Sequence, residues 1–286
     1  MLNNLKKKIV VGTVQFGQSY GVTNFSKKPT LNQIYKILSL AYENNLNKFD
    51  TAPGYNTEKI LGNFIKVHGL EKKVNIFTKI PTIRGKNIED HVRISIEKSM
   101  KNINSNIDTL FFHDASDSFK LMNKAEFIKK IKKDYMIKNI GFSIYNKKEI
   151  KSVNKIKFKF SFQYPLSIAN NEFEKINFGK GKNFARSIFL QGLLLNEQSK
   201  KEIPKSLKES VNLFHNSLKM INQESLELCM SYVANNRNVD YFLIGIDNIN
   251  QLNKILLSKP VKKKKIKLIK NLNLLFKKKD IDPRKW

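Results

Sequence analysis

The chain has 286 residues, of which 41% are hydrophobic, and its formal net charge is +29. Its only cysteine is Cys229, which excludes an internal disulfide and suits a reducing cytoplasm. No stretch approaches the roughly 20 apolar residues of a transmembrane helix, and the polar, basic start over residues 1–8 predicts no signal peptide. We therefore expect a cytoplasmic protein without a membrane partner.

The positive charge taken alone would suit a nucleic-acid-binding protein. The basic runs, however, are spread over both ends and the middle of the chain, at residues 6–8, 129–133, 262–265 and 277–279. This spread is typical of solvated helix faces. No recognised nucleic-acid-binding motif and no interleaving of aromatic and basic residues accompanies these runs. Nucleic acid is therefore a disfavoured partner.

Short β-branched runs alternate with longer runs of helical spacing along the whole chain. The predicted strands are residues 9–15, 48–52, 74–80, 107–113, 138–143, 158–163, 186–191 and 240–245. Helical spacing is found near residues 30–41, 57–64, 88–100, 121–131, 147–153, 206–221, 225–235, 250–256 and 264–276, and the segment 169–183 has no clear pattern.

Eight strands in regular alternation with helical segments predict an α/β fold, a single (β/α)8 TIM barrel over residues 1–286 with a C-terminal helical extension. No composition shift or long polar linker marks a second domain. A doubly wound open sheet is the alternative. No G-x-G-x-x-G follows any predicted strand, so a Rossmann dinucleotide site has no support.

Four chemically different side chains fall at neighbouring strand ends. Asp50 ends the second strand, Tyr55 lies in the loop after it, and Lys79 and His113 end the third and fourth strands. In a parallel barrel these ends share one rim, where catalytic groups gather. Each residue alone is more often a turn, strand-end or packing residue, but their joint placement predicts an active site.

The chain also resembles the aldo-keto reductase family over nearly its whole length. Its signature is matched by Asp50-Thr51-Ala52, Tyr55, Glu58 and Leu61-Gly62, and further matches are Gly12-Thr13, Phe16-Gly17, Thr78-Lys79, Asp108-Thr109-Leu110, His113, Gly141-Phe142-Ser143, Gln163-Tyr164 and residues 190–194 and 243–245. The resemblance implies an NAD(P)-dependent oxidoreductase that converts a carbonyl to an alcohol, with Asp50, Tyr55, Lys79 and His113 as its catalytic tetrad.

The reaction explains these residue types. Negative charge grows on the carbonyl oxygen as hydride reaches the carbon, and a tyrosine phenol is a reluctant proton donor near pH 7. A nearby ammonium such as Lys79 favours the phenolate, and Asp50 would hold that ammonium in place. His113 would donate a hydrogen bond that orients the carbonyl.

The resemblance also implies NADP as cofactor, with NAD as the alternative, a small-molecule carbonyl substrate and no metal. It places the cofactor at Gly12, Thr13, Asp50, Ser143, Gln163, Arg186, Ser187, Gln191, Gly245, Asp247 and Gln251, with Ser143 and Gln163 at the nicotinamide and Ser187, Gln191 and the 245–251 loop along the phosphates and adenosine.

The chain departs from the family pattern at several of these places. Asn56 replaces a glycine after Tyr55, Ile144 replaces a common asparagine, and Arg186 replaces an aromatic residue that stacks on nicotinamide. Asp247 replaces a common serine, and no basic residue follows Gly245 until Lys254, which leaves NADP and NAD both open. Two other functions remain as alternatives: a related barrel that binds cofactor or a partner without turnover, and a Schiff-base enzyme using Lys79.

Overall fold

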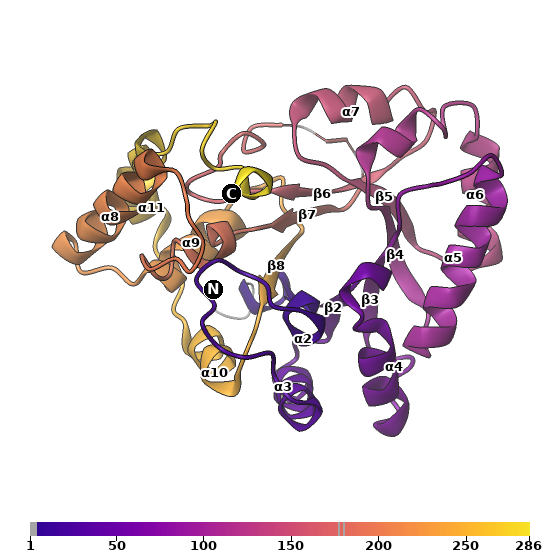
Figure 1. The fold of residues 1–286 in the computed structure, drawn as a ribbon, viewed down its shortest axis with the longest axis horizontal. Coiled ribbons are helices and arrows are strands. Elements are labelled where there is room, and N and C mark those ends of the chain that lie inside the picture. The colour runs from indigo at the N-terminus through magenta and orange to yellow at the C-terminus, as the bar shows by residue number, and fades with distance from the viewer. Residues whose placement is uncertain (1–4, 177, 180) are drawn as a thin grey trace.

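The protein was analysed as a computed structural model that describes residues 5–176, 178–179 and 181–286, without the side chains of 267–270. Eight parallel strands close into a barrel in sequence order, and helices surround it (Figure 1). The strands are β1 Ile9–Gly12, β2 Lys48–Asp50, β3 Asn75–Ile80, β4 Ile107–Phe112, β5 Asn139–Ser143, β6 Ser161–Pro165, β7 Asn183–Arg186 and β8 Tyr241–Gly245. β8 pairs with β1 from Ile9↔Phe242 to Gly12↔Gly245, which closes the sheet and confirms the predicted (β/α)8 barrel.

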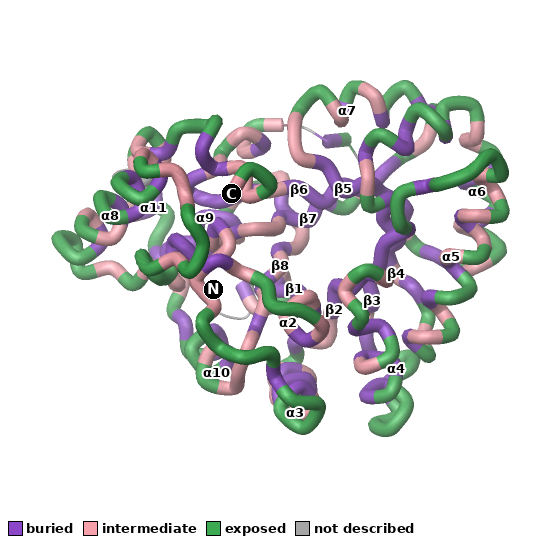
Figure 2. The backbone as a smooth tube through the Cα atoms, viewed as in Figure 1, coloured by how far each residue is buried: buried purple, intermediate pink, exposed green. Residues whose placement is uncertain are grey.

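The helices lie around the outside of the barrel, and exposed and buried residues alternate along them as one side faces solvent (Figure 2). They are α2 Val14–Gly17, α3 Leu31–Glu43, α4 Glu58–Val67, α5 Ile88–Ile103, α6 Ala125–Asp134, α7 Lys147–Val153, α8 Lys205–Met220, α9 Ser225–Ala234, α10 Ile249–Leu257 and α11 Lys263–Ile269. Short 3-10 turns are η1 Pro53–Tyr55, η2 Ala115–Ser118, η3 Leu190–Gly192, η4 Lys270–Leu275 and η5 Pro283–Lys285. Reciprocal capping boxes start α3 at Thr30 and α7 at Asn146, as their sequences favour.

An aromatic cluster fills the inside of the barrel. Phe184 packs against Phe77 at 4.9 Å, Phe111 at 5.1 Å and Tyr241 at 5.1 Å between ring centroids. Because side chains two residues apart on a strand share a face, the residues that follow Phe77, Phe111 and Phe184 by two point the same way, one layer higher. The aromatic cluster is therefore the floor beneath Lys79, His113 and Arg186.

Several predicted boundaries were wrong. β7 is Asn183–Arg186 and not 186–191, because left-handed backbone at Ser187 (φ 56°) and again at Gln191 (φ 54°) cannot continue a strand. This correction moves Arg186 from the start of a strand to its end, at the rim. β6 likewise lies at 161–165 instead of 158–163.

Two further predicted segments change type. Val14 and Gln15 belong to α2 and not to β1, and the tail helix predicted at 264–276 is α-helical only to Ile269 before it tightens into η4. Of the basic start at 1–8, residues 1–4 lie outside the described part of the chain.

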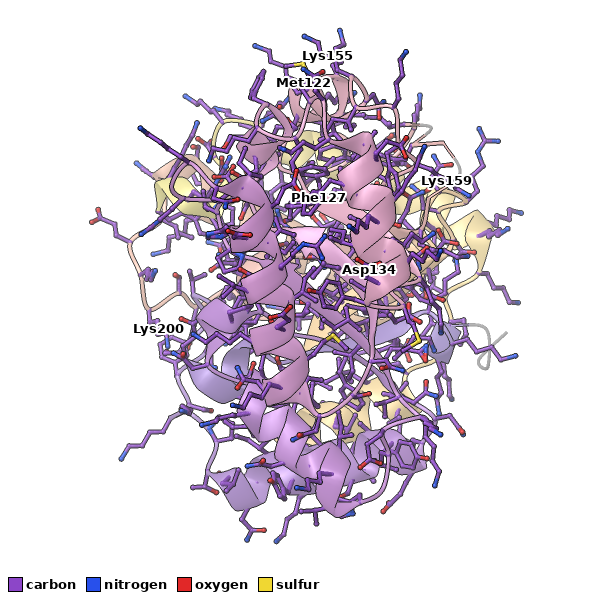
Figure 3. All side chains as sticks on the ribbon, turned by 90° about the vertical axis from the view of Figure 1, so that its right-hand side faces the viewer. Met122, Phe127, Asp134, Lys155, Lys159 and Lys200 are labelled. Atoms are coloured by element: carbon purple, nitrogen blue, oxygen red, sulfur yellow. The ribbon has the colours of Figure 1, made fainter. Side chains whose placement is uncertain are left out.

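Three lysines from different parts of the sequence illustrate where basic side chains lie on the surface. Lys155, Lys159 and Lys200 lie on separate parts of the outline in Figure 3 and are all exposed. In the described part of the chain, no helix combines the length and apolarity needed to cross a bilayer.

We predict that Phe184→Ala lowers the free energy of unfolding by about 3–5 kcal/mol, because the site is fully buried and cannot refill the lost ring volume. Phe25→Ala, at a position 60% exposed, is the matched control and should change it little. Denaturant unfolding of both variants measures the difference, and equal losses would contradict the assigned floor.

Candidate functional site

A buried ion pair stands at the centre of the rim. Lys79 is 1% exposed, and its Nζ donates to Asp50 Oδ1 at 2.7 Å and to the Thr51 carbonyl oxygen at 2.9 Å. The other Asp50 oxygen accepts a hydrogen bond from Gln163 Nε2 at 2.8 Å. Burial alone would lower the pKa of Lys79, but the Asp50 carboxylate and Tyr55 outweigh it and the pKa is raised. Lys79 is therefore a fixed cation at neutral pH.

Tyr55 and His113 complete this group. Tyr55 ends η1 and is half-buried, and Lys79 Nζ lies 4.9 Å from the centroid of its ring. The rings of Tyr55 and His113 are 6.4 Å apart and nearly perpendicular, at 89°. The structure thus brings together all four residues that the sequence places at successive strand ends.

Three threonines and one glycine hold the Tyr55 loop. Thr57 Oγ1 is hydrogen-bonded to Thr13 Oγ1 at 2.8 Å and to Thr51 Oγ1 at 2.9 Å, all buried. Gly17 in α2 lies so close to the loop that a Cβ there would overlap the Tyr55 carbonyl oxygen. The loop therefore depends on the helix after β1 as well as on its own strand.

Asn56, which replaces the usual glycine after Tyr55, takes a left-handed conformation with φ 58°. Asparagine tolerates this region better than most residues, so the turn survives the substitution.

The glutamate and glycine of the signature have structural roles. Glu58 is 3% exposed and accepts hydrogen bonds from Thr78 Oγ1 at 2.8 Å and Asn102 Nδ2 at 3.4 Å. A side chain at Gly62 would overlap the Asn102 carbonyl oxygen, so glycine lets α4 and α5 pack closely. These contacts fix α4, the helix that follows the Tyr55 loop.

His113 is neutral at pH 7. Desolvation of the ring lowers its pKa to about 4, and the positive charges of Lys79 and Arg186 act in the same direction. The carboxylate of Asp114 has a smaller, opposing effect. The ring nevertheless lies at the open rim and is exposed, so solvent screens part of the shift. A neutral imidazole can still donate one hydrogen bond to a ligand.

Three of the predicted cofactor residues line the rim beside the ion pair. Ser143 and Gln163 are neighbours in the β5–β6 register and are 3% and 1% exposed. Arg186, at the end of β7, donates from one guanidinium nitrogen to the Ile144 carbonyl oxygen at 3.1 Å. Of the three, Gln163 is bonded directly to Asp50.

Two of the residues predicted for the phosphates and adenosine, Asp247 and Gln251, are bonded to each other. Asp247 accepts from Asn24 Nδ2 at 2.7 Å, and Gln251 Oε1 accepts from the Asp247 amide at 2.8 Å, at the start of α10. Burial raises the pKa of Asp247 despite hydrogen bonds from Gln251 and Asn24. Both side chains thus serve the local structure.

The contacts seen at the other predicted cofactor positions are made within the protein, mostly through the backbone. Gly12 pairs with Gly245 in the β1–β8 register, and Thr13 is engaged with Thr57. Ser187 and Gln191 lie in the left-handed segment after β7, where the Gln191 carbonyl accepts from Val22 N at 3.1 Å.

Several neighbours of the site could not be predicted. Tyr145 and Arg284 meet beside Arg186, although they lie 139 residues apart in a chain where no motif links them.

Lys200 donates to Ser19 Oγ at 3.3 Å and to the Asn24 carbonyl oxygen, and its charge acts on Asp247. Gln15 lies over Gly245 with its side-chain oxygen buried and unpartnered. A strand-end pattern identifies rim residues, but loop contacts carry no such signal.

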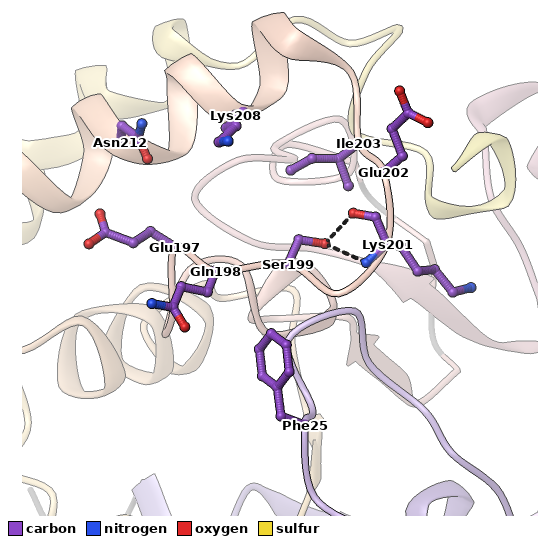
Figure 4. A pocket seen from close by; sticks show the side chains of 9 residues that line it. All are labelled: Phe25, Glu197, Gln198, Ser199, Lys201, Glu202, Ile203, Lys208 and Asn212. Carbon is purple, nitrogen blue, oxygen red and sulfur yellow. Dashed lines mark hydrogen bonds between the residues drawn. The ribbon is translucent and has the colours of Figure 1, made fainter.

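A pocket of about 550 Å³ lies elsewhere, between the 197–203 segment, Phe25 and α8 (Figure 4). Its lining includes Lys201, Glu202 and Lys208 but none of the tetrad or predicted cofactor residues.

Within the described residues, no group of three or more histidine, cysteine or acidic side chains is placed to hold a metal ion.

The profile of the aldo/keto reductase family matches residues 8–274, and the chain therefore belongs to this family of carbonyl oxidoreductases. No curated protein matches the sequence. A glycerol dehydrogenase from Gluconobacter oxydans has a similar structure, with TM-score 0.71 and 17% identity over 96% of this chain and 94% of its own. A Pseudomonas aeruginosa protein assigned as an aldo-keto reductase gives TM-score 0.62 and 16% identity over 87% and 88%. These two likenesses show the fold.

We predict that Gly17→Ala displaces the Tyr55 loop and lowers turnover by about 10-fold or more, since ångström-scale misplacement of a reacting group is costly. Gly54→Ala is the control, because its added methyl group meets nothing within 4 Å and it lies in the same loop. Steady-state kinetics on any accepted carbonyl measures both. Equal turnover of the two variants would show that α2 does not position Tyr55.

We predict that the His113 ring titrates with a midpoint below 6, which NMR of the ring protons can follow. Because its folded pKa is below that of an unfolded histidine, the unfolded chain binds more protons between about pH 4 and 6.5. Acidification through this window should therefore destabilise the wild type more than His113→Gln. A midpoint at or above 6.5 would contradict the neutral imidazole.

Proposed function

We propose that this oxidoreductase reduces an aldehyde, ketone or sugar-derived carbonyl to an alcohol with NADPH or NADH, working in the cytoplasm as one barrel domain over residues 1–286. The observation that carries the proposal is the buried Lys79–Asp50 pair, with its ammonium 4.9 Å from the Tyr55 ring and with His113 across from that ring. This arrangement would supply a proton donor, a cation beside it and a second polar group for the carbonyl oxygen.

The residues beside the pair fit a nicotinamide dinucleotide, which supplies the hydride when bound. Ser143 and Gln163 are nearly fully buried polar side chains at adjacent strand ends. The Gln163 amide nitrogen is used by Asp50, so its oxygen is the atom available to accept from a carboxamide N–H. A Rossmann loop is not needed for this mode of binding.

Tyr55 would donate its phenol proton to the carbonyl oxygen as charge develops there. Lys79 stabilises the phenolate that remains, and Asp50 keeps the ammonium charged and fixed. Neutral His113 would donate a hydrogen bond to the same oxygen and so orient the carbonyl. In the opposite direction the phenolate accepts the alcohol proton.

The proposed preference for NADP rests on the family. Asp247 places a carboxylate near the start of α10, where an anion would otherwise be favoured, and residues 245–251 contain no basic side chain. The positive charge of Lys200 acts on Asp247. Separate dissociation constants for NADPH and NADH decide the preference, and tighter NADH binding would overturn it.

We predict that Tyr55→Phe lowers turnover by about 100-fold or more while cofactor affinity stays within about 3-fold, because the ring remains and only the acid is lost. Carbonyl reduction is followed by cofactor oxidation, and binding by fluorescence titration. Tyr135→Phe is the control, since its phenol bonds Glu97 on the outside of the barrel at 2.7 Å. Wild-type turnover by Tyr55→Phe would remove Tyr55 as the acid.

A further inference from the structure

Arg186 leans over the rim from β7. Its guanidinium donates to the Ile144 carbonyl just beyond β5, so the side chain crosses the end of the intervening strand β6. Its carbon Cζ also lies 4.1 Å from the centre of the Tyr145 ring. These two contacts fix the guanidinium plane, which otherwise would move freely at a strand end.

A second arginine stacks on the same tyrosine. Arg284, in η5 at the C-terminus, has its Cζ 3.8 Å from the Tyr145 ring centre. Its charge is already paired, because Nε donates to Asp282 Oδ1 at 2.9 Å and a terminal nitrogen to Oδ2 at 2.6 Å. η5 thus contacts Tyr145 through a guanidinium whose charge is neutralised locally by Asp282.

Arg186 has no such partner. In the part of the chain that the structure describes, no carboxylate forms an ion pair with it, and its one hydrogen bond leaves four of its five N–H groups free. None of its nitrogen atoms is buried without a partner, so these groups remain accessible. Arg186 is thus a rigid fork of donors with an uncompensated positive charge.

Among the described residues, the charged groups around the reacting side chains form no ion pair with Arg186. Lys79 and Asp50 cancel each other, and His113 is neutral at pH 7. Asp114 lies beside His113, but its carboxylate is used by the Ser116 amide at 2.9 Å and by Thr82 Oγ1 at 3.5 Å. Arg186 is therefore a cation at the rim that no ion pair among the described residues neutralises.

We propose that Arg186 binds an oxyanion of the substrate, so that the enzyme prefers carbonyl compounds that carry a carboxylate or a phosphate. A fixed guanidinium recognises either group through two parallel N–H donors. The inference rests on the proposed function, since it assigns the substrate class to the same site. Arg186 is then a specificity-determining residue and takes no part in proton transfer.

The test compares matched substrates. 4-Carboxybenzaldehyde against 4-formylbenzamide isolates a carboxylate, and glyceraldehyde 3-phosphate against glyceraldehyde isolates a phosphate. Wild type should prefer the charged member of at least one pair in kcat/KM, and Arg186→Gln should lower that preference by about 10- to 100-fold, the scale of a charge-assisted hydrogen bond. Arg186→Lys should retain part of it, because it keeps the charge without the fork.

Arg284→Gln is the matched control. It removes a guanidinium from the same tyrosine, but one whose charge Asp282 already neutralises, so the preference should stay within about 3-fold of wild type. Thermal unfolding of each variant accounts for any loss of folded protein.

Three results would overturn the proposal: equal loss of charged and neutral substrates in Arg186→Gln, a parallel loss of cofactor affinity, or no preference in the wild type. Calorimetric binding of 4-carboxybenzaldehyde in the presence of oxidised cofactor separates this proposal from the reaction itself. Binding that depends on Arg186 without any carbonyl turnover supports the oxyanion site and contradicts only the proposed function.

Discussion

The ion pair between Lys79 and Asp50 is the interaction on which the rest of the rim depends. Both side chains are almost fully buried, so each charge is tolerated only because the other lies 2.7 Å away. Asp50 also holds Gln163, and Lys79 also holds the Thr51 carbonyl that precedes the Tyr55 loop. Residues from β2, β3 and β6 are thereby joined at one point, with the aromatic cluster around Phe184 as the floor below.

Much of this fold follows from sequence pattern alone. Runs such as 107–112 are buried on both faces and short, as parallel strands between helices require, and seven of eight predicted strands overlap the observed ones by at least three residues. The seventh was misplaced because apolar residues at 188–190 continue past the strand, while its end depends on left-handed backbone at Ser187. Hydrophobic pattern does not report such a turn when glycine is absent from it.

The site was predictable where it obeys barrel geometry. Asp50, Lys79 and His113 follow from strand ends and Tyr55 from the adjoining loop, and the structure places them together. The support around them was not predictable, because the Thr13–Thr57–Thr51 bonds and the close approach of Gly17 join separate loops. The Arg186–Tyr145–Arg284 stack joins β7, the loop after β5 and the chain end, where no spacing rule applies.

A double-mutant cycle on Asp50 and Lys79 tests the central claim most directly, with the free energy of unfolding and turnover measured for Asp50→Asn, Lys79→Met and both together. Each single change leaves the other residue's charge buried and unpaired, and should lower the free energy of unfolding by about 3–5 kcal/mol. The double variant should be at least about 2 kcal/mol more stable than the sum of the two single losses predicts. Its turnover should stay as low as that of Lys79→Met, because the ammonium beside Tyr55 is still missing. Additive losses of stability, or wild-type turnover in the double variant, would contradict the account.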